Sequence, residues 1–295
     1  MTSPTVRQPP APRRAYRLPH ETAALAAAEV RAAARRRARR YVAVWVARLA
    51  TIAGLLAGWQ LIATYWLDRF SYSRPSDIAE RLTEWFTSGT VVGSIWTQVS
   101  TTLQETAAGF VIGAASGLTA GVALGRSGFP SAVLAPLIRA ANAVPRIVLA
   151  SLFIIVFGLG VPSKVATAVV MVFFAVFFEA FDSTHDIDEN RIQETHLLGA
   201  NARQTLRHVI LPFAAKRILS SLHAAFGLAL TGALVSEYLG GSRGLGVLIH
   251  NAQASFDVAG IYAGMLIATA LALVAEWALL TLERRLTVAG ARAHG

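Results

Sequence analysis

Long apolar segments limit what this chain can fold into. The first is an uncharged run of nineteen residues, Leu49–Leu67, and a helix of about twenty apolar residues crosses the hydrocarbon core of a bilayer. Inside that core each backbone N–H and C=O needs a partner, which a helix supplies within one segment. Five further runs are predicted to span, at residues 101–125, 134–156, 165–181, 218–236 and 258–282. The sequence therefore predicts an all-α polytopic membrane protein with six transmembrane helices.

Composition excludes several classes of protein. With 54% hydrophobic and 15% charged residues the chain is too apolar for a soluble domain, and without cysteine it has no disulfide or thiol chemistry. The run from Gly158 to Lys164 is not a P-loop, because Ser163 replaces the required glycine. No Ser-His-Asp or paired-carboxylate pattern stands out. We expect a chain that is not an enzyme, with no catalytic residue.

A metal site is also not expected. One polar cluster, His185, Asp186, Asp188 and Glu189, has side chains that can bind a divalent ion. The same acidic residues complement the positive N-terminal end of a helix, and we favour that interpretation.

The N-terminal region differs from the rest of the chain. Residues 1–20 hold five of the eleven prolines, which is typical of a disordered tail. Residues 21–40 change to Ala, Glu and Arg and end in RAAARRRARR, a helix-forming stretch beside the first apolar run. We expect residues 1–40 to be a basic tail and juxtamembrane helix that contacts anionic lipid, rather than a signal peptide or a nucleic-acid-binding arm.

The distribution of basic residues predicts the orientation. Six spans place both termini and the central loop on one side of the membrane, and 19 of the 27 Lys and Arg residues fall on that side. Five fall on the other side: Arg69, Arg74, Arg81, Lys164 and Arg243. Since basic residues accumulate in cytoplasmic loops, both termini are predicted to be cytoplasmic.

The polar interval 182–217, between the fourth and fifth runs, carries helix signals. Asn190 with Gln193, and Asn201 with Gln204, each have the spacing of an N-cap with a side chain that reaches back. Gly199 permits a sharp turn between them, and Pro212 marks where the second helix ends or restarts. Two short helices on one side of the membrane are therefore predicted; a solvated loop fits these residues equally well.

The same interval resembles the EAA loop of ABC-importer permeases. The resemblance rests on the run Gln193-Glu194-Thr195-His196, then Gly199-Ala200, and then Val209-Ile210-Leu211-Pro212, with the family's spacing of thirteen residues from Gly to Pro. The triplet departs from the family pattern, since Gln193 takes the place of the usual Glu. The resemblance covers residues 75–285 and is strongest to permeases of the nitrate, sulfonate and taurine type.

This resemblance implies a type I ABC-importer permease, with the permease domain at residues 41–288 and a short tail at 289–295. Such a permease would sit in a bacterial inner membrane, pair with a second copy, and work with two ATPase subunits and an extracytoplasmic solute-binding protein. Its solute would be small and anionic. The chain itself would need no cofactor, because ATP and Mg²⁺ would bind the ATPase subunits. The coupling residues would be Gln193, Glu194, Thr195, His196, Gly199, Ala200, Val209, Leu211 and Pro212.

Other polar and glycine positions are candidates for the pathway and for packing. Arg139 and Arg146 are seven apart in the third run, so one helix face would present both to an anionic solute, or Arg139 would extend to the membrane edge and Arg146 pair with a carboxylate. The tentative pathway set is Arg139, Asn142, Pro145, Arg146 and Glu237. Gly244, Leu245 and Gly246 resemble the family's outer loop. Glu105 is expected at the interface or facing an aqueous cavity.

Five glycines recur at every fourth position of the second run: Gly109, Gly113, Gly117, Gly121 and Gly125. This spacing predicts a face that another helix approaches closely, in the same chain or in a second copy.

Two other functions remain open from the sequence. A secondary transporter or channel without an ATPase would show broken helices or charged pairs in repeated halves. A membrane scaffold would depend on the basic tail of residues 1–40.

Overall fold

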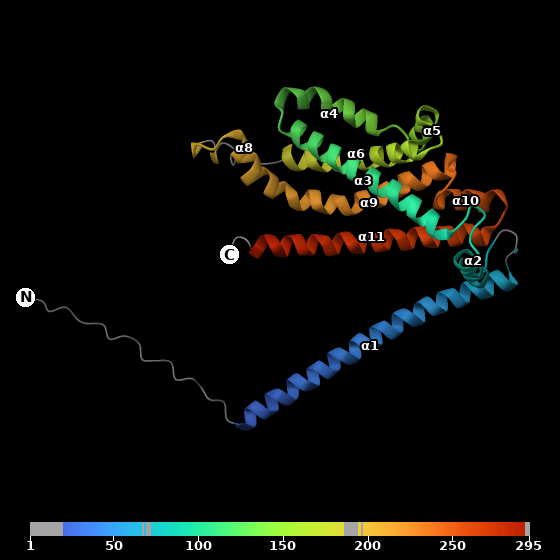
Figure 1. The fold of residues 1–295 in the computed structure, drawn as a ribbon. Coiled ribbons are helices and arrows are strands. Elements are labelled where there is room, and N and C mark those ends of the chain that lie inside the picture. The colour runs from blue at the N-terminus through green and yellow to red at the C-terminus, as the bar shows by residue number, and fades with distance from the viewer. Residues whose placement is uncertain (1–19, 67, 69–71, 186–193, 196, 293–295) are drawn as a thin grey trace, which may run out of the picture. The chain divides into compact units, whose positions relative to one another are not determined.

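The computed structural model of the chain describes residues 20–66, 68, 72–185, 194–195 and 197–292. Regular structure in these residues is helical, apart from an isolated bridge between Thr90 and Gly93 (Figure 1). The helices are α1 (His20–Tyr65), α2 (Pro75–Thr87), α3 (Ile95–Gly125), α4 (Gly128–Asn142), α5 (Arg146–Phe157), α6 (Val161–His185), α8 (Ala202–Thr205), the π-helix η1 (Leu206–Ile210), α9 (Leu211–Gly240), α10 (Leu245–Ala254) and α11 (Val258–Arg292). The predicted all-α fold is confirmed.

The chain divides into two compact units, Met1–Leu61 and Ile62–Gly295. Most of α1 belongs to the first unit, and its segment Arg39–Tyr65 is long and apolar enough to cross a membrane. The helix continues without a break from the Arg-rich stretch into this segment, as the helix-forming composition of residues 21–40 predicts. The predicted disordered tail falls mostly on residues 1–19, which lie outside the described part of the chain.

Four helices of the second unit are also continuous candidate spans: Ile95–Gly125, Val161–His185, Arg217–Gly240 and Val258–Thr281. Each contains one of the predicted apolar runs. A sixth span exists if two bent helices are counted together, Gly128–Asn142 and Ile147–Phe157, which meet at 92°. The described residues therefore hold five spanning helices, or six with the bent pair, in agreement with a polytopic membrane protein.

The third predicted span needs correction. Residues 134–156 were expected to form one kinked helix, but α4 ends at Asn142 and α5 starts at Arg146. Proline has no N–H to donate, and it restricts the residue before it, here Val144, away from helical geometry; Pro145 therefore stands between the two helices as the N-cap of α5. Because the two helices meet at 92°, Arg139 and Arg146 do not share one helix face.

The glycine-rich face of α3 packs against α6. A Cβ atom on Gly113 would lie 2.8 Å from the Val169 carbonyl oxygen, and one on Gly117 would lie 2.7 Å from that of Phe173. As the residue number rises along α3, the number of the contacted residue on α6 rises too, so the two helices run parallel. The close approach predicted from the spacing is thus confirmed, and the neighbour is a helix of the same chain.

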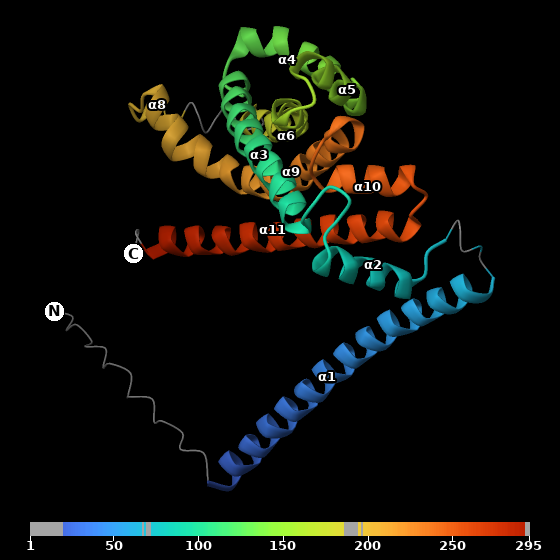
Figure 2. The ribbon, with the colours of Figure 1, turned by 45° about the vertical axis from the view of Figure 1, so that its right-hand side comes forward.

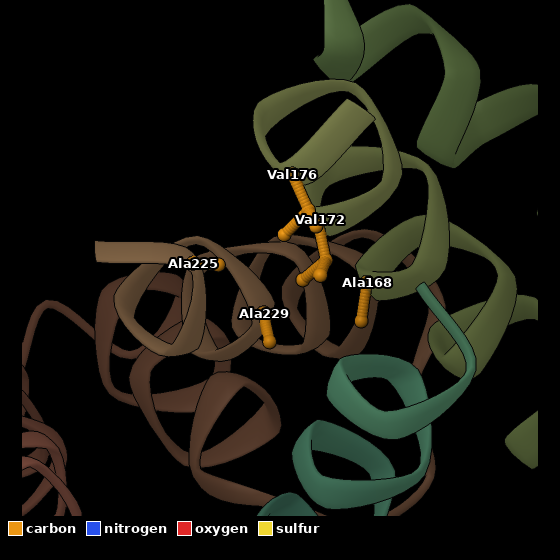
Figure 3. Close-up of a cluster of buried hydrophobic side chains, with 5 residues drawn as sticks. All are labelled: Ala168, Val172, Val176, Ala225 and Ala229. Atoms are coloured by element: carbon orange, nitrogen blue, oxygen red, sulfur yellow. The ribbon is translucent and has the colours of Figure 1, made fainter. Parts of the chain in front are cut away.

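Helix α9 packs against both α6 and α3 and completes the core (Figure 2). Ala168, Val172 and Val176 of α6 meet Ala225 and Ala229 of α9, and all five side chains are fully buried (Figure 3). Partly buried side chains of α3 and α9 pack against this cluster: Phe110, Ala114, Leu118 and Leu222. Small side chains let the three helices approach closely, which in lipid is a main source of helix association.

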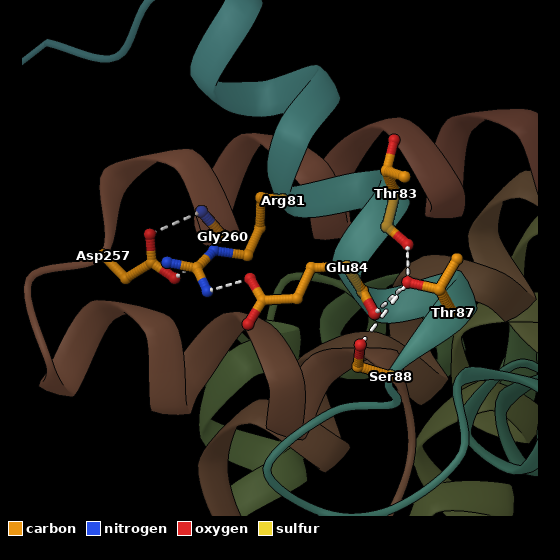
Figure 4. Close-up of polar contacts among 7 residues, drawn as sticks. All are labelled: Arg81, Thr83, Glu84, Thr87, Ser88, Asp257 and Gly260. Atoms are coloured by element: carbon orange, nitrogen blue, oxygen red, sulfur yellow. Dashed lines mark hydrogen bonds and ion pairs between the residues drawn. The ribbon is translucent and has the colours of Figure 1, made fainter.

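Helix α2 packs on α11 through the face that carries Ile78 and Trp85. Both side chains are buried, and Pro75 opens the helix at a position where no N–H is needed. The Arg81 guanidinium lies 3.1 Å from a carboxylate oxygen of Asp257 and 2.7 Å from one of Glu84 (Figure 4). The other oxygen of Asp257 accepts the Gly260 N–H in the first turn of α11, so this ion pair connects the middle of α2 to the start of α11.

Candidate functional site

The polar interval between α6 and α9 is shorter than its predicted bounds, 182–217. Helix α6 continues to His185, with Ser183 and Thr184 buried, and α9 begins at Leu211. Residues 186–193 and 196 lie outside the described part of the chain, and with them the coupling candidates Gln193 and His196, the predicted cap Asn190, and most of the acidic cluster. The described remainder, from Glu194 to Ile210, is called the coupling segment below.

Local hydrogen bonds build the coupling segment as the sequence predicts. The Gln204 N–H donates to the Asn201 side-chain oxygen at 2.9 Å, and the Asn201 N–H donates to the Gln204 side-chain oxygen at 2.9 Å. This reciprocal pair is a capping box, and it starts α8. Gly199 has φ +83°, a left-handed conformation that other residues adopt at a cost. The predicted N-cap and turn are both confirmed.

A shallow cavity of about 360 Å³ lies in the coupling segment. It is lined by Thr195, Leu198, Gly199, Ala200, Gln204, Thr205, His208 and Val209. The fold thus brings together four predicted coupling residues: Thr195, Gly199, Ala200 and Val209. Leu198 of this lining and its chain neighbour Leu197 are each 87% exposed, so two large apolar side chains face away from the packed core of the described chain.

The segment joins α9 through a π-helical turn. Proline at position 212 has no N–H, so the normal helical bond to the carbonyl of His208, four residues earlier, cannot form. Pro212 occupies the first turn of α9, and the five residues before that helix form η1. Pro212 therefore marks a restart of the helix, one of the two outcomes its position predicts. Such single π-turns are frequent at functional sites.

Four of the five candidate pathway residues lie around the break between α4 and α5, and the fifth, Glu237, lies in α9. Arg139 is exposed near the end of α4, Asn142 is that helix's last residue, and Pro145 is exposed at the break. Arg146 begins α5. Glu237 differs from these, because it is 1% exposed and its carboxylate is bonded inside the helix bundle.

The Glu237 carboxylate holds the start of α10. One oxygen accepts the Thr102 hydroxyl at 2.7 Å, and the other accepts the Gly246 N–H at 2.7 Å. Thr102 Oγ1 in turn accepts the Leu245 N–H at 2.9 Å. Gln98 Oε1 accepts the Gly244 N–H at 2.7 Å. We call these contacts of Gln98, Thr102 and Glu237 with Gly244, Leu245 and Gly246 the clamp.

The clamp satisfies three N–H groups that a helix start otherwise leaves without partners. Two of the acceptors come from α3 and one from α9, so the connection between α9 and α10 is fixed to both helices. The predicted outer-loop residues Gly244, Leu245 and Gly246 are thus the residues that the clamp binds.

Two charged side chains beside the clamp were not predicted to be buried together. Glu105 is 3% exposed, so its side chain is buried in the helix bundle and the expected interfacial position is wrong. Lys164, expected in an outer loop, is 2% exposed in α6. Its ammonium group donates to the carbonyl oxygens of Leu159, Gly160 and Gly240.

A sequence signal for the clamp existed. Gln98, Thr102 and Glu105 follow one another at spacings of four and three, which places them on one face of a helix and in line with the glycine face. Sequence spacing alone does not identify their partner Glu237 on α9, which is 135 residues away from Thr102.

Comparison with protein families decides the class of protein. Residues 109–288 match the model of the family described as binding-protein-dependent transport system inner membrane component. The chain belongs to this family. The matched region runs from the first glycine of the α3 face through α11 and includes both the coupling segment and the α9 half of the clamp. The chain is therefore a binding-protein-dependent ABC-importer permease and a multi-pass inner-membrane protein.

Individual relatives of the permease carry similar descriptions. It is 28% identical over 241 residues to the taurine transport system permease protein TauC of Escherichia coli, covering 81% of this chain and 88% of that one. It is 28% identical over 243 residues to the aliphatic sulfonates transport permease protein SsuC of Bacillus subtilis, covering 82% and 87%. Over a shorter stretch of 132 residues it is 34% identical to the riboflavin transport system permease protein RibX of Chloroflexus aurantiacus, covering 45% and 49%.

Proposed function

We propose that the permease imports a small anionic solute of the sulfonate or taurine class by alternating access, as a homodimer with two ATPase subunits and an extracytoplasmic binding protein. ATP and Mg²⁺ bind the ATPase subunits, and this chain contributes no catalytic residue. The solute class is supported by the names of two relatives that align over more than 80% of this chain, a taurine permease and a sulfonate permease.

The observation that carries the proposal is the geometry of the coupling segment. Leu197 and Leu198 are exposed, and Leu198 lines the cavity. Exposed apolar side chains of this kind are typical of a surface that binds a partner protein. The segment continues through η1 into α9, which is 30 residues and therefore about 45 Å long. A partner that moves the segment moves one end of α9, while the clamp holds the other end.

The energy for transport enters as a difference in binding. The ATPase subunits can shift the equilibrium between two states of the permease only by the difference between their binding free energies for those states. The excess of basic residues on the side of the tails supports a cytoplasmic position for both termini and for the coupling segment. The Arg-rich part of residues 1–40 then lies beside the anionic inner leaflet, whose attraction stabilises each positive charge by about 1 kcal/mol.

Co-purification tests this function. The tagged permease, extracted from its host membranes in mild detergent, is expected to carry a soluble ATPase in a stoichiometric amount, measured by mass spectrometry. A permease that purifies without any ATPase would favour a secondary transporter or channel. The one feature that favours that alternative is the broken α4–α5 pair, since broken helices form the solute sites of many secondary transporters.

Truncation separates the importer from a membrane scaffold. We expect a permease without residues 1–40 to keep solute uptake near the full-length rate, because the coupling segment and the clamp both lie in the second unit. Uptake of radiolabelled taurine, or of an alkanesulfonate, by membrane vesicles measures this. Loss of uptake with normal membrane insertion would give the basic tail a role that the importer function does not require.

A further inference from the structure

Three helices bring a buried polar layer to the clamp. Gly109 of α3 and Gly232 of α9 both approach Ala168 of α6 so closely that an added Cβ would collide with it. One helical turn from this contact, toward α10, lie Glu105 and Thr106 on α3, Lys164 on α6, and Ser236 on α9. The layer therefore lies at the far end of α9 from the coupling segment.

This layer is buried but incompletely bonded among the described residues. Glu105 Oε2, Thr106 Oγ1 and Ser236 Oγ are buried and have no hydrogen-bond partner among the described residues. Buried polar atoms without partners cost free energy, because they lose the hydrogen bonds that they make with water. A conformation that admits water to this layer recovers that cost, so the closed arrangement needs other contacts to hold it.

The clamp supplies those contacts. Through Thr102 and Glu237 it joins α3 to α9 and the start of α10, with three bonds of 2.7–2.9 Å. Lys164 adds a second connection, from the start of α6 to the Gly240 carbonyl at the end of α9. Separation of these helix ends would expose the unbonded oxygens and requires that the clamp be broken.

The glycines of the Gly-Leu-Gly signature are explained by the same contacts. Gly244 has φ +113°, and an added Cβ would collide with the Glu237 carboxylate. A Cβ on Gly246 would lie 2.7 Å from the Glu237 Cβ. Glycine at both positions therefore leaves room for the carboxylate, while the Gly246 N–H donates to it and the Gly244 N–H donates to Gln98.

We propose that Glu237 is a positioning residue that keeps the α10 end of the permease closed, by binding the Gly244–Gly246 turn to α3, and that this end opens only when the clamp is released. The inference goes beyond the coupling function proposed above. The inference depends on the proposed alternating access only for the claim that opening serves transport. The opening itself can be measured on this chain alone.

Single cysteines measure this opening without background, since the chain contains no cysteine. The reporter is Ser236→Cys, a buried position whose hydroxyl has no partner to lose. The matched control reporter is Ser183→Cys, which is also buried and unbonded but lies near the other end of α6. The full-length permease in lipid nanodiscs is treated with a water-soluble methanethiosulfonate, and the labelling rate of each thiol is followed by mass spectrometry.

With Glu237 intact we expect both thiols to be protected. Glu237→Gln should raise the labelling rate of the Ser236→Cys reporter by about tenfold or more, because an amide cannot accept from both Thr102 and Gly246 and loses the charge that strengthens those bonds. The Ser183→Cys reporter should keep its slow rate. A Glu276→Gln variant, at an exposed position of α11, should change neither rate.

Thr102→Val and Gly244→Ala break the clamp without altering the carboxylate, and each should act on the reporter as Glu237→Gln does. Several outcomes would overturn the proposal. One is a Ser236→Cys thiol that stays protected in every monodisperse clamp variant, and another is equal acceleration at both reporters, which indicates general loosening. Aggregation of all three clamp variants would make the clamp a requirement for folding instead. None of these results bears on whether an ATPase co-purifies.

Discussion

We expect a Gly199→Asp permease to insert into the membrane but neither to transport solute nor to retain its ATPase. No atom of the described chain lies within 4 Å of a Cβ added at Gly199, so the substitution does not disturb packing inside the permease. It places a charged side chain on the lining of the coupling cavity, where a docked partner would bury it. Burying an unpaired charge in an interface costs several kcal/mol, and 1.4 kcal/mol is a tenfold loss of affinity.

Backbone strain at Gly199 is separated from charge by a matched variant. At φ +83° any L side chain pays about 1–2 kcal/mol, with Asn and Asp paying least. Gly199→Asn has nearly the size of Gly199→Asp without its charge, and we expect it to keep part of both uptake and ATPase retention. Co-purified ATPase and vesicle uptake are measured for the three proteins in parallel. Normal uptake by Gly199→Asp would remove the coupling role from this segment.

Much of this segment followed from local sequence. The capping box of Asn201 and Gln204 and the turn at Gly199 depend on residues within six positions of one another, and the structure has both. Helix α2 is local in the same sense, because Pro75 stands in its first turn and Ile78 and Trp85, seven residues apart, share its buried face. The π-turn before Pro212 was not predicted, because a missing N–H tells where regular bonding fails but not which irregular form replaces it.

The broken third span shows a different limit. Residues 134–156 are apolar apart from a few positions such as Arg139, Asn142 and Arg146, and apolar composition determines whether a segment enters the membrane, not how its helices are directed. Pro145 indicated a kink, and kinks and full breaks have the same sequence signal. The 92° angle between α4 and α5 therefore had to come from the structure.

The clamp could not be predicted as a unit, because its members come from helices far apart in the sequence. The bonds from Thr102 to Glu237 and from Gly244 to Gln98 span 135 and 146 residues. Glu105 and Lys164 each looked like interfacial charges when taken alone. Only the packing of α3, α6 and α9 places them in one layer.

That packing leads to a prediction with a large effect on stability. Gly117→Ala should lower the thermal unfolding midpoint of the purified permease, because the new Cβ would lie 2.7 Å from the Phe173 carbonyl oxygen and 3.1 Å from the Phe177 nitrogen. Both are backbone atoms of α6, so relief requires moving a whole helix. Overpacking of this kind typically costs about 1–3 kcal/mol, and adding Gly113→Ala should lower the midpoint further, since its Cβ would lie 2.8 Å from the Val169 carbonyl oxygen.

Gly227→Ala is the matched control, and its expected effect has the opposite sign. Gly227 lies inside α9 with nothing within 4 Å of an added Cβ, and alanine is favoured over glycine in a helix by roughly 0.5–1 kcal/mol. The midpoint should therefore stay or rise in Gly227→Ala while it falls in Gly117→Ala, measured at one scan rate by tryptophan fluorescence. Equal midpoints for the two variants would mean that α3 and α6 lie farther apart than the structure has them. The buried polar layer beside the clamp, which requires their close packing, would then not exist as described.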